Sequence, residues 1–262
     1  GPLSSAGKAG IRGMRVAAQE VNEQLDEDIE LEMKDGQGSP ETARSVVEDL
    51  LSNDVPAITG TFSSDVSIAL SDLAERESVP FMTAISGAPE VTGPDDEFTF
   101  RMAANTYQQC KGCMEFWKQA GAENVAILAA DYSYGQSVLD YVSKHGSDYG
   151  LNLVHKTLLP LSTNNFTPAL RKVPVDDVDA VLCPFPGGNG PTRIKQARQQ
   201  GFFEDVEYVT GFNSHGTELY REALGEGILG LYTWSVDLEN DRAKQASAAM
   251  QEQFGVRMDA LS

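Results

Sequence analysis

Long apolar runs, basic residues and cysteines are all scarce in this sequence. No stretch approaches the roughly 18 consecutive apolar residues that a membrane-spanning helix needs. The opening GPLSSAGKAG has neither the basic nor the apolar part of a signal peptide, so we expect the sequence to begin downstream of any export signal or to have had none. Lys and Arg number 20 against 39 Asp and Glu, a net charge of −19, which repels phosphate. We expect a soluble globular protein that has neither nucleic acid nor an anionic lipid surface as its partner.

Cysteine occurs three times, at Cys110, Cys113 and Cys183. The first two form one C-x-x-C motif, but a zinc site would need a second pair or nearby histidines, and the histidines lie far away in the sequence. The motif also falls in TYQQCKGCMEFWKQAG, where Cys110 and Trp117 share one face of a predicted helix. We therefore expect cysteines that pack in the core, with no metal ion and no cofactor.

Signatures of catalysis are missing as well. The sequence has no G-x-S-x-G, no Walker P-loop and no G-x-G-x-x-G after a strand. The Gly-rich PGGNGP at residues 186–191 lacks the Lys-Ser/Thr of a phosphate loop, and Ser214 and His215 are adjacent in sequence, where a nucleophile and its base seldom face each other. We assign no catalytic residue.

Helical and strand patterns alternate along nearly the whole chain. Ile11, Met14, Ala18, Val21 and Leu25 mark a first helix, and Ser39 is placed to cap a second one. Strands are predicted at residues 29–36, 57–59, 79–84, 98–105, 124–130, 151–158, 178–185, 206–212 and 227–235. Further helices are predicted at 65–77, 106–120, 136–149, from 167, and at 191–200, 217–224 and 240–254. Repeated β-α units of this length predict parallel, doubly wound sheets, in two runs joined near residues 103–106.

Polar and glycine-rich segments follow the predicted strands, at the end where open parallel sheets bind ligands. Ser63 and Ser64 lie at the start of a helix, where unpaired N–H groups and the helix dipole favour a carboxylate. One serine could instead simply cap that helix. Tyr132 and Tyr134 follow a later strand, where they would cover the apolar part of a ligand or pack on the surface.

Eight motifs also stand in the order found in a known family. They are GPLSSAGKAGIRGMRVAAQEVN, KDGQGSPETARSVVEDLL, ITGTFSSDVS, GAPEVT, DYSYGQS, NNFTPALRKV, DAVLCP followed by IKQARQQGF, and GEGILGLYT. Together they cover nearly the whole chain, which resembles the branched-chain amino-acid-binding proteins of bacteria and archaea. These are the solute-binding components of ABC transporters.

The resemblance implies an α/β clamshell of the type I periplasmic-binding fold, whose two lobes are doubly wound parallel sheets flanked by helices and close by a hinge motion. It divides the chain into a first lobe at residues 1–104, a second lobe at 105–236, and a return to the first lobe at 237–262. It also implies that the first strand of the family precedes Gly1 and that further elements follow Ser262, so that the chain is truncated at both ends.

The resemblance assigns ligand contacts in the first lobe to two loops. Ser64 matches the serine that holds the ligand carboxylate, with Ser63 beside it. Ile85 and Gly87 match the positions that supply a backbone carbonyl and a threonine hydroxyl, with Ser86 between them. Gly87 lacks that hydroxyl, which is a departure from the family pattern.

In the second lobe, the resemblance implies a tyrosine, Tyr134 or Tyr132, and an acidic residue that neutralises the ligand ammonium. Asn213 falls at that acidic position, and an amide cannot supply the missing charge. An aliphatic amino acid is therefore in question as the ligand, and an amide, a urea-like molecule, an amine-free carboxylate or an aromatic acid stays open. Aromatic side chains near the strand ends would suit an apolar or aromatic ligand body: Phe62, Phe185 and Phe212.

We therefore expect a periplasmic or extracellular solute-binding protein, with a membrane anchor ahead of residue 1 as an option. It would bind an amino acid, an amide or a small carboxylate, act as a monomer, deliver its ligand to an ABC permease and perform no chemistry. The alternative is a ligand-sensing regulator or receptor domain on the same fold, which a fused helix-turn-helix, kinase or membrane-spanning segment would reveal.

Overall fold

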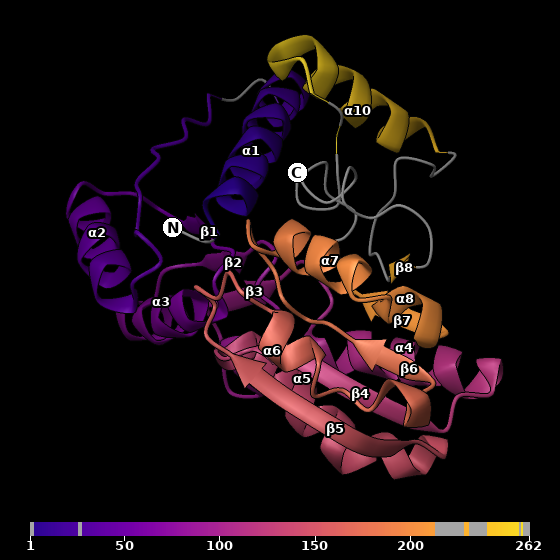
Figure 1. Ribbon diagram of the computed structural model, residues 1–262. Helices are drawn as coiled ribbons and strands as arrows, with labels where there is room; N and C mark the ends of the chain where they lie inside the picture. The colour runs from indigo at the N-terminus through magenta and orange to yellow at the C-terminus, as the bar shows by residue number, and fades with distance from the viewer. Residues whose placement is uncertain (1–2, 26–27, 213–227, 231–239, 257, 259–262) are drawn as a thin grey trace.

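The computed structural model describes residues 3–25, 28–212, 228–230, 240–256 and 258, and its strands form two sheets (Figure 1). Sheet A has the order β1-β2-β3, and its strands are Ile58–Gly60, Phe81–Thr83 and Thr99–Arg101. Sheet B has the order β5-β4-β6-β7-β8, with β4 at Asn124–Ala130, β5 at Asn152–Leu159, β6 at Ala180–Leu182, β7 at Tyr208–Gly211 and β8 at Ile228–Gly230. Every strand pair in both sheets is parallel, which confirms the predicted two-lobed α/β class.

Helices flank both sheets (Figure 1). The helices of the first half of the chain are α1 at Ser4–Leu25, α2 at Pro40–Ser52 and α3 at Ser64–Glu77. Around sheet B lie α4 at Thr106–Ala120, α5 at Ser133–His145, α6 at Thr167–Leu170, α7 at Gly190–Gln199 and α8 at Phe202–Asp205. Short 3-10 turns occupy Pro89–Val91, Gly146–Tyr149 and Val175–Asp177. The helix α10, Asp241–Phe254, packs against α1, where Gln253 donates a hydrogen bond to Gln19.

Sheet A buries one face against α2 and α3. Phe81 of β2 and Leu73 of α3 are fully buried in a cluster with Val47 of α2. Alternate residues of β2 point to this side of the sheet. The predicted N-cap is confirmed, since the Ser39 hydroxyl accepts a hydrogen bond from the Thr42 N–H at 3.2 Å. On the other face, Met82 and its neighbour in register, Phe100, are exposed at 40% and 49%.

Sheet B is covered on both faces, as a doubly wound sheet requires. The central strand β4 alternates between two cores: Leu128 packs with Phe166 and Phe202 on the side of α6 and α8, whereas Ile127 packs with Trp117 on the side of α4 and α5. The three cysteines are buried within these cores, and burial raises the pKa of each thiol. They are packing residues, as predicted.

Two local predictions are wrong. Residues 29–36 form no strand, because no strand of the described part pairs with them in a hydrogen-bond ladder, and Ile29 is 45% exposed. The helix α1 forms as predicted but buries a different face. Its N-terminal half packs Ala6 and Ala9 against loops of sheet A, whereas Ile11 and Leu25 of the predicted apolar face are exposed. The predicted helix at 217–224 lies outside the described residues.

The chain passes from sheet A to sheet B through residues 102–105, between β3 and α4. Asn105 then starts α4 with a capping box, in which its side chain accepts from the Gln108 N–H and the Gln108 side chain accepts from the Asn105 N–H. The capping box therefore sets the start of α4, the first helix beside sheet B.

Candidate functional site

The loops at the carboxyl ends of β1 and β2 emerge side by side. Gly60 and Thr83 are partners in the ladder, and the Ala84 N–H donates to the Gly60 carbonyl at 3.0 Å. Residues 61–63 then lead into α3, and residues 84–88 lead into the 3-10 turn at Pro89–Val91. The segments that carry Ser63, Ser64, Ile85, Ser86 and Gly87 are therefore brought together, as the sequence predicts.

Two of these serines join the loops to each other. The Ser64 hydroxyl accepts a hydrogen bond from the Ala88 N–H at 3.2 Å, and Ser64 is only 1% exposed. The Ser86 hydroxyl donates to the Thr61 carbonyl at 3.1 Å and lies 2.5 Å from the Ser67 hydroxyl. Ser64 and Ser86 are thus committed to the loop structure, whatever else their hydroxyls contact.

Arg101, at the end of β3, forms hydrogen bonds with the loop at residues 84–88 and with Thr92 beyond it. Its guanidinium donates to the carbonyl oxygens of Ser86 at 2.5 Å and Ala88 at 2.7 Å, and its Nε donates to the Thr92 hydroxyl at 3.2 Å. Burial lowers the pKa of Arg101 from its ordinary value. Sequence reasoning missed this residue; the signal for it was a charged side chain inside the alternating segment FTFRMAAN.

Ser63 differs from Ser64 and Ser86. It occupies the N-cap position of α3 with extended backbone angles, but its side chain makes no capping hydrogen bond. It is half-buried. The simple helix-cap interpretation therefore does not describe Ser63, whose hydroxyl makes no hydrogen bond within the described part of the chain.

Tyr134 of α5 lies against Gly87. A Cβ placed on Gly87 would stand 2.8 Å from two carbons of the Tyr134 ring and 3.3 Å from the Thr106 methyl, so a side chain larger than hydrogen does not fit without movement. The rings of Tyr132 and Tyr134 lie 5.9 Å apart, and Tyr132 is largely buried in the core of sheet B. The structure thus brings Tyr134 to the loop at residues 84–88.

A contact that the sequence did not predict joins α3 to α5. The Asp65 carboxylate accepts a hydrogen bond from the Ser133 N–H at 3.1 Å and another from the Ser133 hydroxyl. The predicted start of α5 at residue 136 hid this contact, because it left Ser133 in a loop.

The remaining predicted residues are placed less uniformly. Phe62 and Ile85 are partly buried and pack against Ala6 and Ala9 of α1. Phe185 and Phe212 are both 1% exposed and belong to the two cores of sheet B, where Phe185 meets Phe166 edge-on at 5.0 Å. Asn213 lies outside the described residues.

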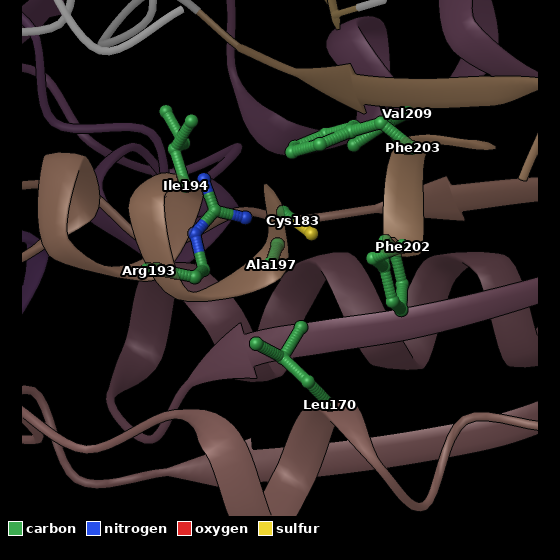
Figure 2. Close-up of a pocket in the computed structure, with 8 residues that line it drawn as sticks. All are labelled: Leu170, Cys183, Arg193, Ile194, Ala197, Phe202, Phe203 and Val209. Atoms are coloured by element: carbon green, nitrogen blue, oxygen red, sulfur yellow. The ribbon is translucent and has the colours of Figure 1, made fainter. Parts of the chain in front are cut away.

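A small apolar cavity lies elsewhere, within sheet B and its helices (Figure 2). Cys183, Phe202 and the almost fully buried Arg193 are among its lining residues. Burial raises the pKa of the Cys183 thiol, and the neighbouring Arg193 partly opposes that effect. The cavity lies in the core, away from the serine-bearing loops.

Within the described ranges, no group of three or more His, Cys, Asp or Glu side chains is arranged to hold a metal ion. The same residues include no helix that is both long and apolar enough to cross a membrane.

Comparison with known proteins identifies the family and the fold. The sequence model of one family, described as periplasmic binding protein, matches residues 1–262. Among curated proteins, the Leu/Ile/Val-binding protein homolog 8 of Brucella abortus is 23% identical over 241 residues, which cover 87% of this chain and 60% of that protein. This chain therefore spans about 60% of the length of the curated relatives that it matches.

Two solved structures illustrate the shared fold. A solute-binding protein of an ABC transporter from Rhodopseudomonas palustris BisB5, in complex with 3,4-dihydroxybenzoic acid, has a TM-score of 0.86 at 22% identity, covering 100% of this chain and 73% of that one. The branched-chain amino acid transporter substrate-binding protein LivJ from Streptococcus pneumoniae, in complex with isoleucine, has a TM-score of 0.88 at 19% identity, covering 100% of this chain and 76% of that one.

Proposed function

Because the chain belongs to the periplasmic binding protein family, we propose that it is the solute-binding component of an ABC transporter, which captures a small carboxylate between its two lobes. The observation that carries this proposal is the paired loops at the carboxyl ends of β1 and β2. One loop leads into the start of α3, and the other lies at Gly87 against Tyr134 of the second lobe. The sensor alternative gains no support, since the two solved structures described above are transporter proteins.

The proposed anchor for the carboxylate is the N-terminus of α3. The first N–H groups of a helix have no partner within it and carry partial positive charge, so they favour an anion. Ser63 adds a hydroxyl that is not used for capping. Ser64 is only 1% exposed and accepts from the Ala88 N–H, and the Ser86 hydroxyl donates to the Thr61 carbonyl. We therefore assign the direct contact to the more exposed Ser63 and give Ser64 and Ser86 the role of holding the loops.

The proposed ligand body lies toward Tyr134. The Tyr134 ring, which packs against the backbone of Gly87, covers the ligand from the side of the second lobe. Phe185 and Phe212 lie in the cores of sheet B, so we assign them to packing rather than to the ligand. Asn213, which matches the acidic position of the family, stays assigned to the ligand site by that resemblance alone. Similar proteins bind 3,4-dihydroxybenzoic acid and isoleucine, and both molecules carry a carboxylate.

The rest of the assignment follows from the transport role. We propose a protein that performs no chemistry, works as a monomer in the periplasm or outside the cell, and hands its ligand to a permease. Residues 1–104 and 105–236 form its two lobes, and residues 237–262 return to the first.

A thermal-shift screen of the full-length protein tests this function. The panel contains aliphatic amino acids, aromatic acids such as 3,4-dihydroxybenzoate, amides and urea. A ligand present at about 100 times its dissociation constant adds about 2.7 kcal/mol to the free energy of unfolding, which raises the melting temperature by several degrees. We expect shifts with carboxylates and none with urea. If no carboxylate shifts the melting temperature at millimolar concentration, the proposed function is wrong.

A further inference from the structure

Asp65 occupies an unusual position between two helices. It lies in the first turn of α3, but its carboxylate bonds to Ser133, the first residue of α5 in the other lobe. The residue before α5, Tyr132, makes no side-chain cap to that helix. The early N–H groups of a helix need an acceptor, and a carboxylate is favoured there by the helix dipole. Asp65 thus supplies from one lobe the cap that α5 lacks in its own.

A second contact between the lobes lies at the crossover. The Thr106 N–H, the first of α4, donates to the Gly87 carbonyl at 2.7 Å. Thr106 directly follows the crossover at residues 102–105, so this bond lies at the hinge. Ser133 follows the crossover by way of α4 and β4, and α5 also meets it directly, because the Thr106 hydroxyl lies 2.8 Å from the Ser137 hydroxyl. The bond between Asp65 and Ser133 is thus a further point, besides Gly87 and Thr106, at which the two halves of the chain are joined.

The bond to Asp65 also bears on Tyr134, the next residue along α5. When Ser133 is held at α3, the Tyr134 ring meets Gly87, where even a Cβ would come within 2.8 Å. The fit is close enough that a small displacement of α5 would separate the ring from the loop. An acid in the first turn of α3 would by itself disfavour a ligand carboxylate there, but the two hydrogen bonds from Ser133 and the N-terminus of α5 partly offset its charge.

We propose that Asp65 is a positioning residue of the ligand site: by capping α5 across the cleft, it holds Tyr134 over the 84–88 loop in the closed protein. It also fills the N-terminus of α5, so that a ligand carboxylate is directed to α3. The role in ligand retention rests on the proposed function, whereas the cap itself does not.

Amide hydrogen exchange at Ser133 tests the cap without any ligand. The full-length protein is compared with Asp65→Ala, Asp65→Asn and Asp72→Ala, the last being an acid farther along α3 that pairs with Arg44. Loss of a hydrogen bond to a charged group should accelerate Ser133 exchange about tenfold or more in Asp65→Ala. Asp65→Asn keeps an acceptor oxygen and should restore part of the protection, and Asp72→Ala should match the wild type.

Protection of the Phe81 amide, which bonds to the Phe98 carbonyl in sheet A, shows that each variant is folded. If Ser133 exchanges at the wild-type rate in folded Asp65→Ala, the proposed cap does not exist in solution.

Ligand dissociation then tests the positioning role, with isoleucine and 3,4-dihydroxybenzoate as the two probes. Asp65→Ala should raise the dissociation rate about tenfold or more while changing the association rate by no more than about twofold. Ser133→Ala in the Asp65→Ala background should add nothing further, because the partner is already gone. Equal dissociation rates in wild type and Asp65→Ala would overturn the role. If neither probe binds the wild type, the proposed ligand class fails, and the exchange experiment still decides whether the cap exists.

Discussion

Separate roles for Ser63 and Ser64 give the sharpest test of the site. In Ser64→Ala, the buried Ala88 N–H loses its acceptor, which should lower the free energy of unfolding by about 1–3 kcal/mol. Ser63 makes no capping bond, so Ser63→Ala should change that free energy by less than about 0.5 kcal/mol. Its effect should instead appear in binding, as a loss of about 1.5–3 kcal/mol of affinity for a carboxylate.

Urea unfolding measures the first quantity, and calorimetric titration with the ligand found by thermal shift measures the second. Ser45→Ala serves as the control for both, since Ser45 is an exposed serine within α2 and lies outside the two loops. The reasoning is refuted if Ser63→Ala unfolds more easily but binds the ligand as tightly as the wild type. That pattern would mean that Ser63 caps α3 in solution and does not contact the carboxylate.

Three further predictions concern other parts of the molecule. Gly87→Ala should weaken ligand binding at least about tenfold, because the added methyl group meets the Tyr134 ring at 2.8 Å; unchanged affinity in titration would show that the two do not pack together in the closed protein. Two opposing effects act on the pKa of Glu75. Partial burial raises it, but hydrogen bonds from the N–H groups of Glu97 and Phe98 lower it by more, so that the pKa lies below the ordinary 4.5. The hydrogen bonds of Glu75 therefore stabilise the fold above pH 4.5 and lose their contribution as the pH falls through the lowered pKa. Glu75→Gln should accordingly flatten the acid side of a plot of melting temperature against pH. A plot parallel to that of the wild type would contradict this. Burial also raises the pKa of the thiols of Cys110, Cys113 and Cys183. A thiol reagent at about pH 8 should therefore label them only as fast as the protein unfolds, and immediate labelling would contradict their burial.

Elements with a strong local signal could be predicted from the sequence. The helix at 106–120 and the strand at 124–130 have the predicted bounds, because a capping residue and a continuous apolar run mark their ends. Residues 29–36 alternate equally well but form no strand, since a strand depends on a neighbour that local sequence does not reveal. The buried face of α1 could not be predicted either, because the residues that pack it against the loops of sheet A are the small Ala6 and Ala9, which give no strong apolar pattern.

The meeting of the two loops could be predicted from the sequence, but the roles of their hydroxyls could not. Serines after a strand point to a ligand loop, and the loops do meet. Which hydroxyl is committed to the backbone depends on the distance from Ser64 to Ala88, 24 residues away, and no local pattern contains that distance. The same holds for Asp65 and Ser133, which are 68 residues apart. Phe185 and Phe212 stand at strand ends, but the packing of sheet B buries them.

The proposed function depends on a carboxylate that binds at the start of α3. Calorimetric titration of the full-length protein with matched pairs tests it directly: isoleucine against isoleucinamide, and 3,4-dihydroxybenzoate against its amide. We predict that the acid of at least one pair binds about tenfold or more tightly than its amide, and that Ser63→Ala narrows the difference. Equal or tighter binding of the amide in every pair that binds would contradict the claim.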